Sequence, residues 1–374
     1  MRLNRHQWSW HEGNCSELLV DGARYFPAML GAIGSARREL LLEFYYVRSG
    51  ALMDRLIEAL VAASEREVRV CLLIDGFGGR ELASADRQRL IRAGVQLAVY
   101  NPIRLRNVSL NLARDHRKLL LVDGEEVFTG GTGLTDEFYS GATHQPPWHE
   151  LMLRLRGPVV GDWRTLFARQ WWWVTGEQLA AAKMPPPCGH QRMKIATTAG
   201  PLHQGIKVSF RRQINRAEQR VWMVTAYFLP SWSVRRALRR AARRGVDVRL
   251  LLPGPYTDHP WLYHAARRYY HQLLLAGVRI FEYQPRFVHA KVSLCDDWVS
   301  LGSCNMDHWN LRWNLEANQE VQDADLAAKV VQTFVADQAD SQEITLAGWQ
   351  QRPRGHRIFS FVVGYVSALL LRLF

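Results

Sequence analysis

Two stretches of the chain carry the same pattern of residues. Residues 116–123 read HRKLLLVD, and residues 289–296 read HAKVSLCD. On a strand, side chains two positions apart project to the same face. The His and Lys of each copy are therefore expected on one face, ahead of a short buried strand that ends in a turn at the Asp. A single HxK is usually a surface pair and a single HxKxxxxD is moderate evidence of a site, but two copies of HxKxxxxD at equivalent places predict a shared functional site.

The sequence around these stretches is also duplicated. Residues 68–76 (VRVCLLIDG) recur as residues 246–254 (VDVRLLLPG). Strands that alternate with helical patterns indicate α/β units on a mostly parallel sheet. We predict an α/β fold of two pseudo-symmetric repeats, with two sheets packed about a two-fold axis and one shared active site at their interface. The predicted segments are a first repeat (1–180), a Pro-containing linker (181–200), a second repeat (201–345) and a basic and apolar C-terminal segment (346–374).

Composition narrows the class of protein. The 374 residues include 48 Lys and Arg against 35 Asp and Glu, a net charge of +13, and 48% are hydrophobic. This excludes a disordered chain. The five cysteines lack a CxxC pair, which indicates a reducing compartment and no structural zinc. The charge predicts an anionic partner, which could be a phosphate, a nucleic acid or an acidic lipid surface.

The two ends of the chain differ in character. The first residues contain no apolar segment typical of a cleaved signal peptide. Near the other end, residues 358–371 carry no charge and are flanked by arginines. As a helix this segment would span about 21 Å, less than the hydrocarbon core of a bilayer at about 30 Å. It is either a terminal helix packed on the core or an anchor in the membrane surface, and its lack of a polar face favours the anchor.

The paired motif and the duplication resemble the phospholipase D superfamily over nearly the whole chain. The chain looks most like bacterial cardiolipin synthases of the shorter B type, in stretches such as residues 10–14 (WHEGN), 241–246 (AARRGV) and 314–318 (NLEAN). The resemblance implies a phosphohistidine intermediate, no metal and no cofactor. It also implies phosphatidyl transfer between two phosphatidylglycerol-type lipids with release of glycerol. Water in place of the second lipid would make a phospholipase D-type hydrolase.

Two histidines can divide this chemistry between them. One neutral imidazole attacks phosphorus, while the other, protonated, gives its proton to the leaving alkoxide and later takes one from the incoming alcohol. By analogy with the superfamily, His116 is the expected nucleophile and His289 the acid and base. Lys118 and Lys291 are expected to stabilise charge on the non-bridging oxygens, so a metal ion is not needed.

Other polar residues complete the predicted site. Hydroxyl and amide donors to the phosphate oxygens are expected from Thr132, Ser303 and Asn305. The family places an acidic residue after each motif to orient an imidazole, which assigns Glu150 to His116 and Glu316 to His289. The predicted catalytic set also includes the motif residues Asp123 and Asp296, for which a turn-fixing role is favoured over proton transfer.

The sequence departs from the family pattern in two places. Gly133 stands where the family often has an Asn, so one phosphate donor is missing. Five residues separate Asp296 from the following Gly302, where the first half has six between Asp123 and Gly130. Neither change removes a His, Lys or Glu of the predicted site, so activity is expected. His149, beside Glu150, either packs in the core or reaches the site.

The substrate needs evidence beyond the motif, because the superfamily includes nucleases. Residues 234–244 form a predicted helix with arginines on one face, which could meet lipid headgroups, meet a phosphate backbone or simply face solvent. No nucleic-acid-binding module is evident. Anionic phospholipids and a membrane surface are therefore the expected partners, with no nucleic acid. The expected location is the cell inner membrane, peripheral or monotopic on the cytoplasmic side. The alternatives are a phosphodiesterase on nucleic acid and a non-catalytic basic membrane-binding protein.

Overall fold

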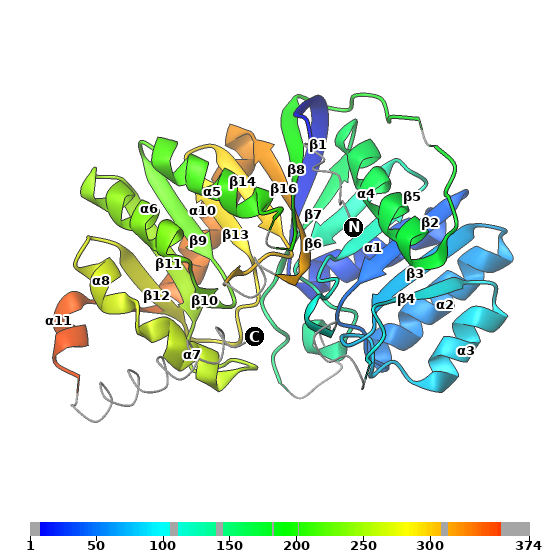
Figure 1. The fold of residues 1–374 in the computed structure, drawn as a ribbon, viewed down its shortest axis with the longest axis horizontal. Coiled ribbons are helices and arrows are strands. Elements are labelled where there is room, and N and C mark those ends of the chain that lie inside the picture. The colour runs from blue at the N-terminus through cyan, green and yellow to red at the C-terminus, as the bar shows by residue number, and fades with distance from the viewer. Residues whose placement is uncertain are drawn as a thin grey trace.

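The structure is a computed structural model, and it describes residues 8–104, 111–139, 145–181, 183–200, 202–307 and 313–352. The chain forms two lobes that lie side by side (Figure 1). The predicted C-terminal anchor at residues 358–371 lies outside the described residues. Within the described residues, no helix is long and apolar enough to span a bilayer.

Each lobe is built from the same succession of strands and helices. The first contains β1 (His11–Val20), α1 (Gly22–Ser35), β2 (Glu39–Phe44), α2 (Ala51–Glu65), β3 (Arg69–Asp75), α3 (Ser84–Arg92), β4 (Gln96–Tyr100), β5 (Leu119–Val122), β6 (Glu126–Gly130), the 3-10 helix η2 (Asp136–Phe138), β7 (Leu151–Arg156) and α4 (Val159–Thr175).

The second lobe repeats this order with short additions. It contains β8 (Gln191–Ala199), α5 (Gly205–Arg216), β9 (Arg220–Val224), β10 (Phe228–Leu229), α6 (Trp232–Arg243), β11 (Asp247–Pro253), α7 (Pro260–Arg267), α8 (Tyr270–Leu274), β12 (Arg279–Tyr283), β13 (Val292–Cys295), β14 (Trp298–Gly302), β15 (Met306–Asp307), β16 (Leu315–Gln322), α10 (Ala324–Ala339), β17 (Ser341–Ile344) and α11 (Leu346–Gln350).

Apart from β10 and β15, which pair with each other, the described strands of both lobes join in one sheet rather than in the two separate sheets that the repeat predicted. The strand order of this 15-stranded sheet is β17-β12-β11-β9-β13-β14-β16-β8-β1-β7-β6-β5-β2-β3-β4. Read outward from the β1–β8 contact, the two halves have the same order. The prediction of a mostly parallel sheet is wrong in detail, because β2, β3 and β4 are parallel whereas β5, β6, β7 and β1 pair antiparallel.

The apolar residues explain the layers. The strands β5 and β13 are fully buried. Both lie inside the sheet rather than at its edge, and β5 consists of apolar residues alone, as is typical of a strand covered on both faces. A shared core is formed by both lobes, with Trp163 and Phe167 of α4 and Leu326 and Phe334 of α10 in one cluster. The two lobes therefore fold against each other, which fixes the relative position of the strands that carry the two motifs.

The junction between the lobes differs from the predicted linker. The strand β8 occupies residues 191–199, which the sequence pattern placed in the linker, and it pairs with both β1 and β16. Cys188, just before β8, forms a disulfide with Cys15 of β1, while Cys71, Cys295 and Cys304 are buried and free. The expectation of reduced cysteines is therefore wrong for the Cys15–Cys188 pair.

Candidate active site

Both motif histidines open into one cavity between the lobes. The cavity has a volume of about 690 Å³, and its described lining includes His116 and Lys118 of the first lobe and His289 of the second. Each histidine lies just ahead of the buried strand of its motif, β5 or β13. The structure thus brings together the two residues on which the predicted chemistry depends.

Backbone pairing across the lobes holds each histidine in place. The His116 N–H donates to the carbonyl of Leu315 at 2.9 Å, and the His289 N–H donates to the carbonyl of His149 at 2.8 Å. These contacts belong to two short parallel bridges, one between Asp115 and Leu315 and one between His149 and Val288. Each motif is therefore tied to the segment that carries the acidic residue of the other lobe.

The acidic residues consequently pair with the histidines in the opposite sense to the prediction. Glu316 Oε1 lies 3.0 Å from His116 Nδ1, and Glu150 Oε2 lies 2.7 Å from His289 Nδ1. From the sequence, each Glu was expected to pair with the histidine of its own repeat. That assignment is wrong because the bridges cross between the lobes. Both carboxylates are fully buried, and each holds an Nδ1 nitrogen so that the Nε2 nitrogen is left for chemistry.

The two lysines lie beside their own histidines, as the strand alternation predicted. Lys118 Nζ donates to the carbonyl of His116 and lies 5.2 Å from the centre of the Tyr45 ring. Lys291 Nζ donates to the carbonyl of His289, lies 3.1 Å from His289 Nε2 and is 3.6 Å from Glu150 Oε2. Both ammonium groups can therefore stabilise negative charge that develops next to an imidazole.

Burial dominates the electrostatics of the site. Burial and the positive charges of the two lysines hold the pKa values of His116 and His289 well below the usual range. Burial raises the pKa of Glu150 to about 7 and of Glu316 to about 8, although the lysines oppose the shift. Burial also lowers the pKa of Lys118 to about 7. An anion in the cavity would favour the charged forms of the lysines and imidazoles.

Aromatic rings pack around both imidazoles. The Tyr45 ring meets His116 edge-on, with centroids 4.7 Å apart. Around His289 lie Phe138, Trp148 and Phe287, with centroids 5.2, 5.4 and 5.6 Å from the imidazole. These rings fix the planes of the imidazoles and limit water around them. No sequence pattern assigned these aromatic residues to the site, because an isolated aromatic residue carries no positional signal.

The three predicted phosphate donors do not line the described cavity wall. Thr132 is buried with its hydroxyl 3.1 Å from the Tyr25 hydroxyl. Ser303 donates its hydroxyl to Glu316, at 2.5 Å. Asn305 is buried and accepts from Thr225 at 3.4 Å. The hydroxyl groups of Thr132 and Ser303 and the amide oxygen of Asn305 are engaged within the protein, which gives these residues a supporting role behind the wall. Among the described residues, the Asn305 Nδ2 amide is buried without a hydrogen-bond partner.

The motif residues Asp123 and Asp296 lie away from the imidazoles. Each stands at the far end of its buried strand in a left-handed conformation, with φ of 53° and 52°. Asp123 accepts from the backbone N–H groups of residues 37–39, and Asp296 accepts from those of residues 218–220. These carboxylates fasten the motif turn to the start of β2 or β9. The structure therefore supports the turn-fixing role and not the place in the catalytic set.

The two departures from the family pattern have local explanations. A Cβ atom at Gly133 would lie 2.8 Å from the carbonyl oxygen of Tyr46, so the backbone packs too closely there for an Asn. The shorter second motif removes one turn residue, because β13 and β14 are joined by Asp296 and Asp297 alone. Asp296 still reaches its three backbone N–H groups, so the shortening leaves the motif strand anchored.

His149 does not reach the cavity but forms a buried charge cluster behind it. Its Nδ1 lies 2.8 Å from Asp21 Oδ1 and its Nε2 lies 3.1 Å from Asp337 Oδ2. Arg286 also contacts Asp21, at 2.5 Å. Burial lowers the pKa of His149, but the hydrogen bonds to the two carboxylates outweigh it and raise the pKa to about 9. The cluster joins α1, α10 and the two segments that carry Glu150 and His289.

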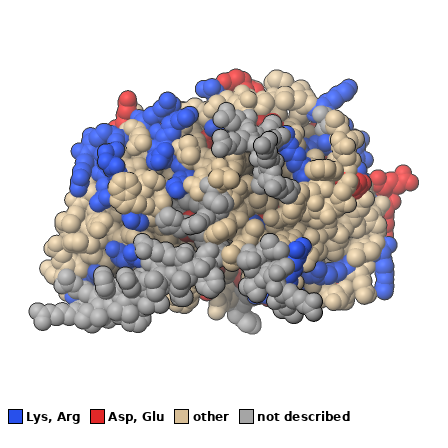
Figure 2. Space-filling view, in the orientation of Figure 1, with Lys and Arg blue, Asp and Glu red and all other residues tan. Residues whose placement is uncertain are grey.

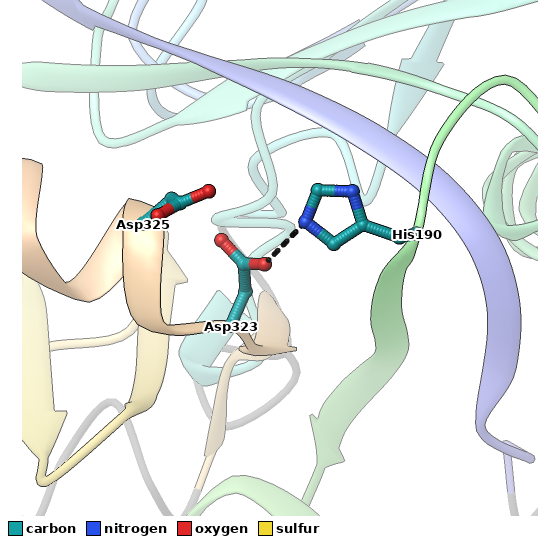
Figure 3. A group of neighbouring side chains, drawn as sticks. All are labelled: His190, Asp323 and Asp325. Atoms are coloured by element: carbon teal, nitrogen blue, oxygen red, sulfur yellow. Dashed lines mark ion pairs between the residues drawn. The ribbon is translucent and has the colours of Figure 1, made fainter.

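One group outside the cavity has the residue types of a metal site. The ligand atoms of His190, Asp323 and Asp325 lie within 4.8 Å of one another. Figure 3 shows the three side chains as neighbours. Asp323 follows β16 at the end opposite Glu316, and its carboxylate caps α10 by accepting from Leu326 N–H at 2.8 Å. His190 Nε2 lies 3.2 Å from Asp323 Oδ2. This group plays no part in the cavity, where the lysines and imidazoles carry the positive charge.

The chain matches known proteins over most of its length. A family model described as "Cardiolipin synthase, PLD-like domain" matches residues 29–171 and 210–338. Cardiolipin synthase A of Pseudomonas aeruginosa is 36% identical over 338 residues, covering 89% of this chain and 68% of that protein. Cardiolipin synthase 2 of Bacillus anthracis is 32% identical over 361 residues, covering 94% of this chain and 70% of that protein.

A solved structure confirms the fold independently. The phosphatidylserine synthase of Haemophilus influenzae superimposes with a TM-score of 0.75 and 12% sequence identity, covering 95% of this chain and 94% of that one. The duplicated α/β architecture is therefore shared well beyond the range of sequence similarity.

Proposed function

The chain belongs to the PLD-like family of cardiolipin synthases and is a phosphatidyltransferase of that family, and from this premise we propose how its residues carry the reaction. The substrate class is phospholipid. The observation that carries the proposal is the pair of imidazoles in one cavity, each held at Nδ1 by a carboxylate from the other lobe. Two such groups can relay a phosphatidyl group between alcohols.

The geometry favours His116 as the nucleophile. Its Nδ1 bonds to Glu316, and among the described residues no hydrogen bond engages its Nε2. By contrast, Lys291 Nζ lies 2.8 Å from Nδ1 and 3.1 Å from Nε2 of His289, so an ammonium group already stands beside this imidazole. In the first step, His116 Nε2 bonds to phosphorus of phosphatidylglycerol while the P–O bond to glycerol breaks. Protonated His289 supplies the proton that glycerol takes as it leaves.

In the second step, His289 acts as the base instead of the acid. The glycerol hydroxyl of a second phosphatidylglycerol attacks the phosphohistidine, its proton passes to His289, and the P–N bond breaks. The products are cardiolipin and a free His116. Lys118 and Lys291 stabilise the charge on the phosphorus oxygens in both steps. The predicted absence of a metal requirement remains part of this proposal.

A basic face on the second lobe supports association with an anionic membrane. The helices α5 and α6 lie against each other, carry four and five basic residues, and contain no acidic residue. Lys and Arg side chains gather over them in Figure 2. Among the described residues, the exposed arginines Arg211, Arg236 and Arg240 make no ion pair, whereas Arg267 and Arg279, elsewhere in the second lobe, are paired with carboxylates.

Unpaired arginines on a rigid face are attracted to anionic headgroups. The apolar side of α6 is buried against the lobe, so this contact would be electrostatic rather than inserted. We place the protein at the cytoplasmic side of the cell inner membrane, held peripherally or monotopically, with anionic phospholipids as substrates and no nucleic acid. Binding to phosphatidylglycerol vesicles that weakens steeply with salt would support this placement.

The reaction is tested with purified protein, phosphatidylglycerol and EDTA in detergent. The expected products are cardiolipin and glycerol, absent with His116→Ala. Phosphatidic acid as the product would mean a hydrolase instead. Cleavage of DNA by the wild type, lost in the same variant, would mean a nuclease. Failure to trap a phosphoryl group on either histidine would contradict the covalent mechanism.

A further inference from the structure

The two walls of the cavity differ in charge. The wall from the first lobe carries Arg80, stacked 4.2 Å above the Phe77 ring, and Arg114, whose Nη1 lies 3.6 Å from Asp75. The acidic residues on that wall, Glu81 and Glu137, both pair with Arg48. This wall therefore presents guanidinium groups and neutralised carboxylates, which suit a phosphate group.

The wall from the second lobe presents a carboxylate that, among the described residues, is not paired with an arginine or a lysine. Asp258 lies between β11 and α7 and accepts a hydrogen bond from the Tyr227 hydroxyl. Among the described residues, the nearest basic group to it is the imidazole of His259, at 3.8 Å, and no Lys or Arg pairs with it. Its side chain is 21% exposed and lines the cavity. A carboxylate without a basic partner repels a phosphodiester, so binding of the phosphate does not explain why Asp258 lines the cavity.

Asp258 lies on the side of the cavity where the headgroup alcohol must stand. The Tyr227 ring is 6.4 Å from the Phe287 ring, which is 5.6 Å from His289. Burial lowers the pKa of Lys291, and the carboxylates of Glu150 and Asp258 oppose that shift, so Asp258 is within electrostatic reach of this lysine. With His116 attacking phosphorus, the leaving and incoming alcohols both lie toward His289.

The chemistry of a carboxylate matches that alcohol. An ionised Asp only accepts hydrogen bonds, and a hydroxyl that keeps its proton donates one. Glycerol retains at least one hydroxyl beyond the oxygen that reacts. We propose that Asp258, oriented by Tyr227, is the subsite that binds the non-reacting hydroxyls of the glycerol headgroup, in both the leaving alcohol and the acceptor lipid. This inference rests on the proposed transfer reaction.

The acceptor arm of the test compares glycerol with 1-propanol, which lacks the extra hydroxyls. Purified wild type and Asp258→Ala are incubated with phosphatidylglycerol and each labelled alcohol, and the initial rates of exchange are measured. A hydrogen bond to a charged group governs such selectivity, so the variant should lower the glycerol-to-propanol ratio by about tenfold to a hundredfold. Transfer to 1-propanol should persist, and Tyr227→Phe should show a smaller change in the same direction.

The matched control is Glu81→Gln, which removes a carboxylate from the opposite, arginine-lined wall. It should leave the ratio between the two alcohols unchanged, and melting temperatures should show that all variants are folded. An unchanged ratio in Asp258→Ala, or an equal change in Glu81→Gln, would overturn the subsite.

The donor arm of the test measures the same subsite through release of the headgroup, which occurs whether an alcohol or water accepts the phosphatidyl group. The rates of headgroup release from phosphatidylglycerol, phosphatidylpropanol and phosphatidylethanolamine are compared. Asp258→Ala should lower release from phosphatidylglycerol relative to phosphatidylpropanol by about tenfold. A selective loss of phosphatidylethanolamine turnover would overturn the proposal in favour of an ammonium site. A wild type that only hydrolyses would refute the transfer function while this arm still decides the subsite, and a wild type inactive on every donor would refute both.

Discussion

The two half-sites of the cavity share one plan but differ in how each is supported. In the first, His116 is held by Glu316, which also accepts a hydrogen bond from Ser303. In the second, His289 is held by Glu150, and the position matching Ser303 is Gly131, which has no hydroxyl to offer. A duplicated motif thus places two similar imidazoles, and the residues behind them make the two unlike.

The same contrast extends to the second layer of residues. The bridge beside His116 has Leu315 at the position where the bridge beside His289 has His149. Leu315 packs on the apolar core, whereas His149 is charged and clamped between Asp21 and Asp337. The half-site proposed for proton transfer is therefore the one with an ionic support. In a duplicated fold, two identical reactive groups can therefore take different roles when the residues that contact them differ.

The largest expected effect separates the roles of the two histidines. Both His116→Ala and His289→Ala should lower cardiolipin formation by at least about 10⁴-fold, because the pair acts as a unit. With a p-nitrophenyl phosphatidyl donor, whose leaving group needs no proton, only His289→Ala should still form a phosphohistidine. Mass spectrometry of acid-quenched protein checks this, and a phosphoryl group on His289 in the His116→Ala variant would reverse the assignment.

Next in size, the crossed pairing predicts which imidazole each carboxylate controls. Glu150→Gln should slow turnover by about 10²- to 10³-fold, since it removes the charge that stabilises the imidazolium. In nitrogen NMR spectra, this variant should shift the resonances of His289 and leave those of His116 nearly unchanged. Glu316→Gln should do the opposite. Shifts of the histidine in the same repeat would contradict the crossed arrangement.

A smaller effect tests the difference between Gly131 and Ser303. A Cβ atom at position 131 would lie 2.2 Å from Glu150 Oε2, so Gly131→Ala should displace that carboxylate and cost about tenfold or more in rate. Ser303→Ala removes one hydrogen bond to Glu316 without a clash and should cost less, about tenfold at most. Steady-state rates of the two variants are compared. A larger loss of rate in Ser303→Ala than in Gly131→Ala would contradict this prediction.

The smallest effect on catalysis is expected from His149, whose role is in stability. Its pKa of about 9 in the folded protein exceeds the unfolded value near 6.5, so its stabilising contribution is complete below pH 6.5 and is lost as pH rises through 9. The shift corresponds to on the order of 3 kcal/mol. Urea unfolding between pH 6 and pH 10 should show this loss in wild type. His149→Leu, which copies Leu315, should be less stable at pH 6 and lack this pH dependence.

Much of the site was predictable because the motif is local and occurs twice. The His and Lys of each copy are two residues apart, so their common face follows from strand geometry, and the buried strand follows from the apolar run after Lys118. The duplicated segments likewise predicted the α/β repeats. The joining of both repeats in one sheet was not predictable, because the strand β8 lies in a stretch whose prolines are typical of a linker.

For residues that contact a partner in the other lobe, no local sequence pattern indicates which partner that is. Glu150 and Glu316 both contact a motif imidazole, but proximity along the chain assigned each to the wrong one. Thr132, Ser303 and Asn305 have the right chemistry for phosphate, yet none of them lines the described cavity wall, and the hydroxyl groups of Thr132 and Ser303 are bonded inside the protein. Asp258 and Tyr227 were not recognised, because a carboxylate and a phenol 31 positions apart become one unit only when β10 and the loop before α7 meet.

The order of residues along this chain therefore specified the reactive groups, their faces on the strands and the existence of two copies, since these depend on spacing within a few residues. Folding alone established which carboxylate holds which imidazole, which polar groups face the cavity and how the two walls differ. Those features depend on contacts between segments far apart in the sequence, such as Glu150 with His289. They also depend on burial, which lowers the pKa values of both imidazoles and raises those of Glu150 and Glu316.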